Sequence, residues 1–303
     1  MITKESGLFG DSYFSIEPLI DKIHTFMRHI LITGGNSGIG KTTAKALSTN
    51  KDLIVIASKN NQRVKNAVTE IKSISNHKQV YGMVCDLASF DSVRDFAEEY
   101  TREFGHLDVL INNAGLITDQ LQYTKEGFEL QFGVNHLGHF LLTQSLIPLL
   151  TKSKEPRIIN VSSTAHRKAK INFNSFKGEL GPKKYNGMAA YGQSKLANIL
   201  FTKELARLYP DITSHCLHPG VVSTNIAGKN AKKLWGIMWT ILSPFMLNAR
   251  KGAATTVYLA NDPGVLKTNG KYFEKQKEKM PSEIARDKEL ATKLWKVSEQ
   301  LIK

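Results

Sequence analysis

Runs of consecutive apolar residues recur along the chain from residue 29 onward, and most of them are bounded by glycine or polar residues. Short runs of this kind are typical of parallel strands that are buried on both faces. They predict strands over residues 29–33, 53–57, 79–85, 107–111, 157–161 and 212–217, with a last strand over 270–273.

Between these runs, apolar residues recur at three- and four-residue spacing, which is the period of an amphipathic helix. This spacing predicts helices from a glycine-rich turn to about residue 49 and over 63–74, 90–104, 125–150 and 188–208, with a core helix around Tyr258 and Leu259. Alternating strands and helices predict an α/β fold, a single-domain Rossmann-type doubly wound parallel sheet with helices on both faces and right-handed crossovers.

We assign residues 29–303 to this one domain, because no internal repeat or low-complexity linker interrupts it. Residues 1–28 are an N-terminal extension, in which Ile16, Leu19, Ile20 and Ile23 fall on one helical face. We expect this partly helical segment to pack on the domain, with a membrane surface or a second subunit as the other candidate contacts.

Composition narrows the class of protein. The net charge is +14, but the Lys and Arg residues are scattered and show no spacing typical of nucleic-acid binding. We therefore expect a solvated basic surface and no nucleic-acid partner. No apolar run reaches the length of about 20 residues that a membrane-spanning helix needs, and the N-terminus lacks a secretory pattern. Cys85 and Cys216 form no disulfide framework, so a reducing, cytoplasmic location is expected.

The glycine-rich turn after the first strand, residues 33–40, is typical of a dinucleotide-binding site. Its glycines permit a tight turn and a close approach of the backbone to a pyrophosphate, which then faces the N-terminus of the next helix. Residues 35–42 also read G-x-x-x-x-G-K-T, the phosphate loop of nucleotide triphosphatases, and Asp86 stands where such an enzyme would hold magnesium. From this segment alone the two interpretations stay open.

The end of the second strand favours the dinucleotide. An acid there would bind the 2′-hydroxyl of NAD, whereas a small residue followed by a cation suits the 2′-phosphate of NADP. This chain has Ser58-Lys59. We therefore expect NADP(H) as the preferred cofactor and NAD(H) as the second candidate.

Tyr191 and Lys195 are a candidate proton-transfer pair. They are four residues apart in the predicted helix 188–208, so their side chains emerge on one face. A neighbouring ammonium stabilises a phenolate and brings the phenol pKa closer to neutrality. Taken alone, the spacing also fits an accidental amphipathic pair.

These motifs, in their order and spacing, resemble the short-chain dehydrogenase/reductase family over residues 29 to about 275. The resemblance rests on Thr33-Gly34-x-x-x-Gly38-x-Gly40, Asp86-Leu87, Asn112-Asn113-Ala114-Gly115, Asn135, Asn160-Val161-Ser162-Ser163, Tyr191-x-x-x-Lys195 and Pro219-Gly220-Val221-Val222-x-Thr224. Within the family, residues 139–142, 160–163 and 191–198 look most like the retinol-dehydrogenase-like branch. That branch tends to prefer NADP(H) and lipophilic alcohols and carbonyls.

Two departures from that branch stand out. Its second strand commonly ends in Cys-Arg, whereas this chain has Ser58-Lys59, which keeps the charge but loses the guanidinium fork. Many members also carry an N-terminal membrane anchor, which we do not find in this sequence.

The resemblance implies four catalytic residues. Tyr191 would be the general acid in carbonyl reduction and the general base in alcohol oxidation. Lys195 would lower the Tyr191 pKa and bind the nicotinamide ribose. Ser163, in the second-serine position of its motif, would hydrogen-bond the substrate oxygen. Asn135 would hold a water that links Lys195 to solvent. The gap between Ser163 and Tyr191 is longer than in many relatives, so residues 164–190 contain an insertion.

The resemblance also implies a cofactor site along the carboxyl ends of the strands. Its residues would be Gly34, Asn36, Ser37, Gly38, Ile39, Gly40, Ser58, Lys59, Asp86, Leu87, Asn113, Ala114, Gly115, Tyr191, Lys195, Pro219, Gly220, Val222 and Thr224. We expect no metal site, because His136, His139, His215 and His218 lack a carboxylate or thiolate that would complete a ligand set.

The substrate side is expected after Thr224. Residues 234–247 are strongly apolar and too short to span a bilayer. A substrate lid around 225–250 would suit a retinoid, steroid or polyprenoid, and with Lys229, Lys232 and Lys233 it could contact a membrane surface. A core helix or a homodimer contact is the alternative for this segment. The alternative functions are a broad-specificity carbonyl reductase, a non-catalytic NADP(H)-binding redox sensor and a triphosphatase.

Overall fold

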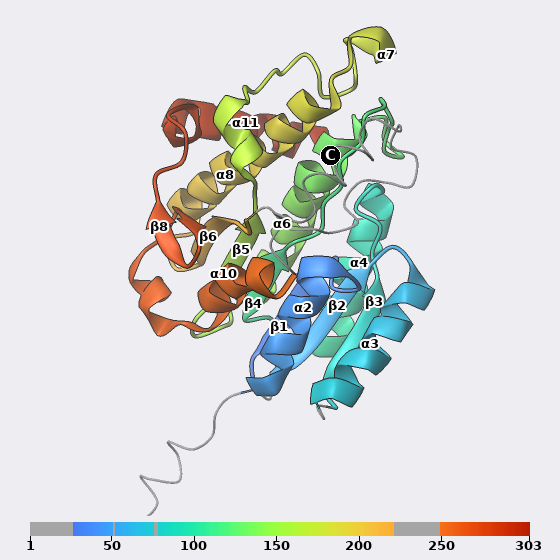
Figure 1. The fold of residues 1–303 in the computed structure, drawn as a ribbon, viewed down its shortest axis with the longest axis vertical. Coiled ribbons are helices and arrows are strands. Elements are labelled where there is room, and N and C mark those ends of the chain that lie inside the picture. Colours follow the sequence, from blue (N-terminus) through green and yellow to red (C-terminus); the bar gives the residue numbers. More distant parts are fainter. Residues whose placement is uncertain (1–26, 51, 76–77, 221–248) are drawn as a thin grey trace, which may run out of the picture.

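The computed structural model describes residues 27–50, 52–75, 78–220 and 249–303. Its centre is an eight-stranded sheet with the order β3-β2-β1-β4-β5-β6-β7-β8, in which the first seven are parallel and β8 is antiparallel to β7 (Figure 1). The strands are β1 (His29–Thr33), β2 (Leu53–Ser58), β3 (Val80–Val84), β4 (Val109–Asn112), β5 (Arg157–Val161), β6 (Thr213–His218), β7 (Lys271–Glu274) and β8 (Lys277–Lys279).

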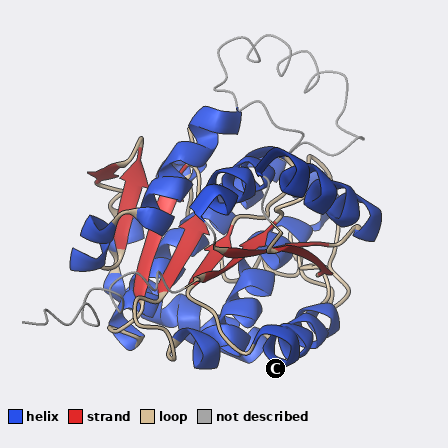
Figure 2. Ribbon diagram, turned by 90° about the horizontal axis from the view of Figure 1, so that it is seen from below, coloured by secondary structure: helices blue, strands red, loops and turns tan. Residues whose placement is uncertain are grey.

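Helices cover both faces of the sheet (Figure 2). The α-helices are α2 (Gly38–Leu47), α3 (Asn61–Ser75), α4 (Phe90–Phe104), α5 (Leu130–Phe132), α6 (Gly138–Leu150), α7 (Gly181–Lys184), α8 (Gly187–Leu208), α10 (Ala249–Asn261) and α11 (Lys288–Leu301). A π-helical turn, η2 (Gly133–Leu137), joins α5 to α6. The 3₁₀ turns are η1 (Ser48–Asn50), η3 (Thr164–Lys168), η5 (Pro263–Lys267) and η6 (Ile284–Arg286).

Two hydrophobic cores follow from the alternation of side chains along each buried strand. Leu31 of β1 joins the core under α4, α6, α8 and α11. Its neighbours Ile30 and Ile32 join the core under α2, α3 and α10. The predicted fold class is confirmed: one mostly parallel sheet is covered by helices on both faces (Figure 2). It was predictable because strands buried on both faces need near-continuous apolar sequence.

The predicted helix over residues 125–150 is wrong at its start. The chain first makes an isolated bridge between Tyr123 and Glu129 around Gly127, whose φ of 81° needs glycine. The helix then begins at Leu130, because the Glu129 carboxylate accepts the free N–H groups of Gln131 and Phe132. The apolar spacing alone cannot predict that residues 125–129 are not helical.

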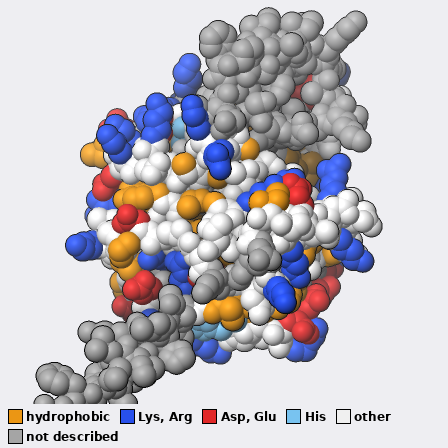
Figure 3. Space-filling view, turned by 60° about the horizontal axis from the view of Figure 1, so that its bottom comes forward, with side chains coloured by type: hydrophobic (Ala, Val, Ile, Leu, Met, Phe, Trp, Pro, Cys, Tyr) orange, Lys and Arg blue, Asp and Glu red, His pale blue; other side chains and the backbone are white. Residues whose placement is uncertain are grey.

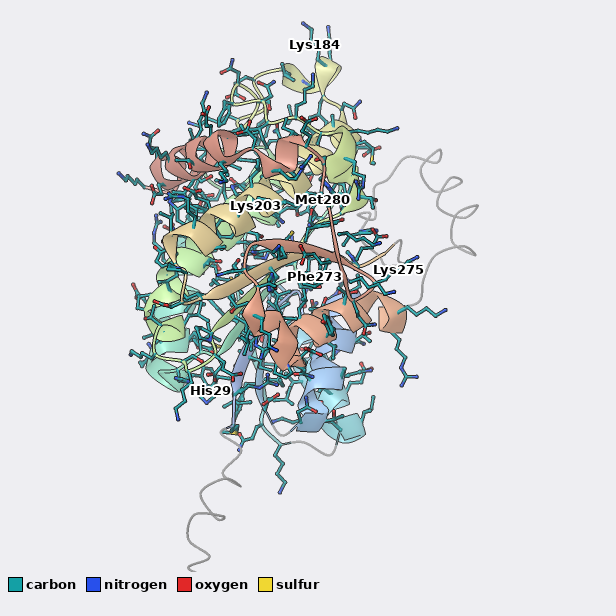
Figure 4. All side chains as sticks on the ribbon, turned by 90° about the vertical axis from the view of Figure 1, so that its left-hand side faces the viewer. His29, Lys184, Lys203, Phe273, Lys275 and Met280 are labelled. Carbon is teal, nitrogen blue, oxygen red and sulfur yellow. The ribbon has the colours of Figure 1, made fainter. Side chains whose placement is uncertain are left out.

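Two C-terminal elements have no counterpart among the predicted ones. Strand β8 consists of three exposed residues without an apolar pattern, and it pairs with β7 through a turn at Lys275 and Gln276, both at positive φ. Lysines on an edge strand discourage pairing with another sheet edge. After it, Met280 is 70% exposed, whereas Phe273 of β7 is buried (Figure 4). Helix α11 covers α8 with Leu294 and Trp295.

Two predictions concern segments that the structure mostly does not describe. The N-terminal extension over residues 1–28 and the lid around residues 225–250 lie outside the described residues, except for residues 27–28 and 249–250. Among the residues that are described, no helix is long and apolar enough to cross a membrane. Lys and Arg side chains are spread among acidic and hydrophobic ones on the face shown in Figure 3.

The packing of α11 predicts a large cost for removing its tryptophan. The Trp295 ring is stacked on Phe201 at 5.7 Å and meets Phe140 edge-on at 4.9 Å. Trp295→Ala should therefore lower the free energy of unfolding by about 3–5 kcal/mol in urea denaturation. Ile74→Ala is the control, because Ile74 is 64% exposed and its loss should cost under about 0.5 kcal/mol. Equal losses in the two variants would contradict the packing described for α11.

Candidate active site

A cavity of about 920 Å³ lies along the carboxyl ends of the central strands, at the neighbours β1 and β4, between which the strand order reverses. This is the place where open α/β sheets bind ligands. Its lining includes Gly34, Asn36, Ser37, Gly38, Ile39, Gly40, Ser58, Lys59, Asp86, Leu87, Asn113, Ala114, Gly115, Tyr191, Lys195 and Pro219. Sixteen predicted residues from six segments of the sequence thus share one cavity.

The glycine-rich turn has the shape of a phosphate cradle. A Cβ atom at Gly40 would lie 2.4 Å from the Gly34 carbonyl oxygen, and Gly34 itself has φ 66°. Only glycine fits this close approach. Ser37 precedes α2 in extended conformation and makes no side-chain cap, so the free N–H groups of the helix N-terminus remain open to an anion.

Thr33 fixes the loop after β4 against the end of β1. Its hydroxyl accepts the N–H groups of Asn113 and Ala114, at 2.9 and 3.0 Å, and lies 2.8 Å from Nε2 of His139. The Asn113 amide donates to the Thr33 carbonyl at 2.7 Å. These bonds hold the two walls of the cavity at a fixed separation.

The triphosphatase interpretation of residues 35–42 is wrong. The Lys41 ammonium pairs with Glu70 on α3 at 2.8 Å, and the Thr42 hydroxyl donates back to the Gly38 carbonyl. Neither residue lines the cavity. A phosphate-binding lysine and a magnesium-binding threonine would both have to face it.

Tyr191 and Lys195 lie on one face of α8, as their spacing predicts. Nζ of Lys195 is 5.7 Å from the centroid of the Tyr191 ring and donates to the Val161 carbonyl at 3.0 Å. Burial lowers the pKa of the Lys195 ammonium to about 8. Burial also raises the pKa of Tyr191, and its hydrogen bond with Ser163 opposes that rise. The expected lowering of the Tyr191 pKa by Lys195 is therefore not found in this structure.

The two serines that end β5 have different surroundings. Ser162 is buried and donates to the carbonyl of Lys195 at 2.7 Å, so it joins β5 to α8. The Ser163 hydroxyl accepts the Ala165 N–H at 3.2 Å. Ser163, and not Ser162, lies with Tyr191 on the wall of a smaller cavity described below.

Asn135 lies beneath the cavity and does not line it. Its amide accepts from Leu116 N, donates to Leu116 O and donates to the Ser194 hydroxyl. A Cβ atom at Gly115 would be 3.3 Å from both Oδ1 of Asn135 and Nζ of Lys195. The side chain is therefore next to Lys195, but its hydrogen bonds join the Leu116 loop to α8.

Three of the predicted cofactor residues are not placed on the cavity wall. Gly220 follows Pro219 directly but is not among the lining residues, and Val222 and Thr224 lie outside the described residues. Conversely, Asn60 and Arg63 line the cavity beside Lys59 and had no place among the predicted residues. Their position in the first turn after β2 is the signal that would have found them.

A second cavity, of about 800 Å³, lies beside η3 and the start of α8. Ser163 and Tyr191 contribute to its wall together with the predicted insertion over residues 164–190. Ala165, Ala169, Leu180 and Met188 give it apolar surface, and Arg167, Lys168, Lys170 and Lys184 give it cationic surface. No cluster of His, Cys, Asp or Glu suited to a metal ion occurs among the residues described.

The short-chain dehydrogenase family model matches residues 28–235. Retinol dehydrogenase 12 of Mus musculus is 40% identical over 275 residues, covering 90% of this chain and 85% of the relative. Retinol dehydrogenase 11 of Homo sapiens is 38% identical, with the same shares covered. The chain belongs to the short-chain dehydrogenase family, and within it to the branch of the retinol dehydrogenases.

Solved structures agree with this fold. An uncharacterised protein from Mycobacterium Paratuberculosis is 31% identical, with a TM-score of 0.72 over 91% of this chain and 93% of that chain. A short-chain dehydrogenase from Escherichia coli CFT073 complexed with NADPH shares the fold at 22% identity, with a TM-score of 0.63 over 82% of this chain and 97% of that chain. The protein is thus an oxidoreductase that interconverts alcohols and carbonyls with a nicotinamide cofactor.

The buried ammonium predicts a pH-dependent cost in stability. The pKa of Lys195 falls from 10.5 to about 8 on folding. Between these two pH values the folded protein binds fewer protons than the unfolded chain, so the cost of burying Lys195 falls and the free energy of unfolding rises with pH. Lys195→Met should therefore raise the free energy of unfolding near pH 7 by about 1–3 kcal/mol, and by less near pH 10.

Denaturation of the cofactor-free protein at both pH values measures this effect. The Val161 carbonyl keeps a bond from Asn198 at 3.2 Å in the variant. Lys41→Met, on the surface of α2, is the control and should change stability by under about 0.5 kcal/mol. A Lys195→Met variant that is less stable than wild type near pH 7 would show that the ammonium stabilises the fold.

Proposed function

We propose that the protein is an NADP(H)-dependent oxidoreductase that interconverts a lipophilic alcohol and its aldehyde or ketone. One observation carries the proposal: Tyr191 lies on the wall of both cavities, and Ser163 shares the wall of the smaller one with it. A group that moves a proton between substrate and protein needs this position, with the cofactor on one side and the substrate on the other.

The side chains supply the proton chemistry, and a bound nicotinamide supplies or accepts the hydride. In carbonyl reduction the Tyr191 hydroxyl donates its proton to the carbonyl oxygen, and in alcohol oxidation the same oxygen accepts the proton. The Ser163 hydroxyl hydrogen-bonds the substrate oxygen and stabilises the charge that develops on it. Lys195 binds the nicotinamide ribose and returns protons to Tyr191.

Asn135 has a supporting role in this proposal. Its three side-chain bonds hold the Leu116 loop against α8. The loop contains Gly115, which lies close to the Lys195 ammonium. A water on the Asn135 side of that ammonium would link it to solvent, as the family resemblance implies.

The preference for NADP(H) rests on two cations at one edge of the larger cavity. Lys59 directly follows β2, and Arg63 lies in the first turn of α3. The backbone N–H of Arg63 donates to the Asn60 side chain at 2.9 Å. The guanidinium of Arg63 supplies the bidentate donor that Lys59 lacks. A 2′-phosphate beside β2 would meet both charges.

A lipophilic substrate is supported by the apolar wall of the smaller cavity and by the names of the relatives. The lid and its membrane contact, proposed from residues 225–250, lie almost wholly outside the described residues. Cytoplasmic location and a homodimer remain part of this proposal. A broad-specificity carbonyl reductase is the second candidate, and it is favoured by the wide cationic and apolar lining of the smaller cavity.

The first test removes the hydroxyl of Tyr191. Tyr191→Phe should lower kcat for retinal reduction by at least about a hundredfold, because it removes the hydroxyl that is proposed to protonate the carbonyl oxygen. The Kd of NADPH, measured by fluorescence titration, should stay within about twofold of wild type, because the ring remains in place. Substantial residual turnover would remove Tyr191 from its role.

The second test separates the two cofactors. Lys59→Ala and Arg63→Ala should each weaken NADPH by about tenfold and leave NADH within about twofold, because a charged hydrogen bond to the 2′-phosphate is worth about 1.5–3 kcal/mol. Lys41→Ala is the matched control and should change neither, since Lys41 pairs with Glu70. Equal losses for NADPH and NADH would show that these cations do not touch the phosphate.

A further inference from the structure

His166 is fully buried directly behind Ser163, and both of its ring nitrogens are engaged. Nδ1 lies 2.6 Å from the Ser163 carbonyl oxygen, and Nε2 lies 3.2 Å from the backbone nitrogen of Ser282. A backbone N–H can only donate, so Nε2 is the acceptor. The proton of the neutral ring is therefore on Nδ1, which donates to Ser163.

The Ser163 carbonyl determines how its hydroxyl is presented. Ser163 is extended, with φ −154° and ψ 157°, and is the second residue after β5 and the last before the turn η3. Its carbonyl accepts two hydrogen bonds, from the His166 backbone N–H at 3.2 Å and from the ring. Two donors on one carbonyl fix the peptide plane, and with it the backbone of Ser163 where this residue shares the cavity wall with Tyr191.

The other end of the ring is fixed by the C-terminal segment. Arg167 donates to the Met280 carbonyl at 3.4 Å, so the stretch from β8 to Ser282 runs beside η3 (Figure 4). The Tyr272 ring of β7 meets the His166 ring edge-on at 5.2 Å. His166 thus links the turn that carries Ser163 to an element more than one hundred residues later in the sequence.

The surroundings keep His166 neutral. Burial lowers the pKa of its ring, and the positive charge of Arg167 acts in the same direction, while the Ser163 carbonyl opposes them. A positive charge on His166 would also be repelled by a positive charge on His218. A second proton would place an Nε2–H against the Ser282 N–H, so protonation would break the link to the C-terminal segment.

We infer that His166 is a positioning residue for the reaction, which aims the Ser163 hydroxyl at the substrate oxygen through the Ser163 carbonyl. The inference rests on the proposed function, in which Ser163 stabilises that oxygen. It predicts that changes at His166 act on kcat through Ser163 and leave cofactor binding unchanged.

A double-mutant cycle in the full-length protein, with retinal and NADPH, tests this. His166→Leu should lower kcat by about ten- to a hundredfold, as expected for a displaced oxyanion donor, with the Kd of NADPH within about twofold. His166→Asn should recover to within about threefold of wild type, because its amide nitrogen can replace Nδ1. The kcat of the double variant Ser163→Ala/His166→Leu should be within about twofold of the kcat of Ser163→Ala. Both changes remove the same contribution, which is the hydrogen bond from the Ser163 hydroxyl to the substrate oxygen.

Independent losses that multiply in the double variant would overturn the inference, since they would mean that His166 acts elsewhere. A wild-type rate in His166→Leu, or an equal loss of NADPH affinity, would also overturn it. If His166→Leu does not fold, His166→Asn and His166→Gln decide. Gln can replace only the Nε2 acceptor, so a Gln variant faster than the Asn variant contradicts the inference. Wild-type turnover in Ser163→Ala would instead contradict the proposed role of Ser163.

Discussion

The buried ammonium of Lys195 is the constraint on which the rest of the site depends. A charge removed from water is costly unless polar groups surround it. The Val161 carbonyl accepts a hydrogen bond from this ammonium at 3.0 Å. Because Val161 ends β5 and Lys195 lies on α8, the bond can form only when the strand and the helix are packed together.

The sheet topology provides that convergence. Strands β1 and β4 are neighbours in the sheet. The strands β2 and β3 extend the sheet on the β1 side, and the strands from β5 to β8 extend it on the β4 side. The gap between their carboxyl ends is where the glycine turn, the Thr33 hydroxyl network and the Gly115 loop meet. The proposed phosphate-binding turn and the proposed proton-transfer pair therefore share one edge of the sheet, where open α/β folds generally bind ligands.

Local chemistry was predictable from the sequence, and long-range geometry was not. The glycine turn and the Tyr191–Lys195 pair depend on spacing within one turn or helix, and the structure places the residues predicted for them on one cavity wall. Arg63 and His166 were missed, because their roles depend on neighbours that only the fold provides, such as the Ser282 N–H. The start of α5 was missed because the Glu129 cap overrides the apolar period of the preceding residues.

The central claim is that the two cavities meet at Tyr191 so that a hydride can pass from one to the other. Tracing deuterium from NADPH labelled at C4 into a panel of retinal, a steroid ketone and a polyprenal tests it most directly. We predict that at least one substrate gives an alcohol with a single deuterium on the former carbonyl carbon. Tight NADPH binding with no deuterium in any product would contradict the claim and favour a cofactor-binding sensor.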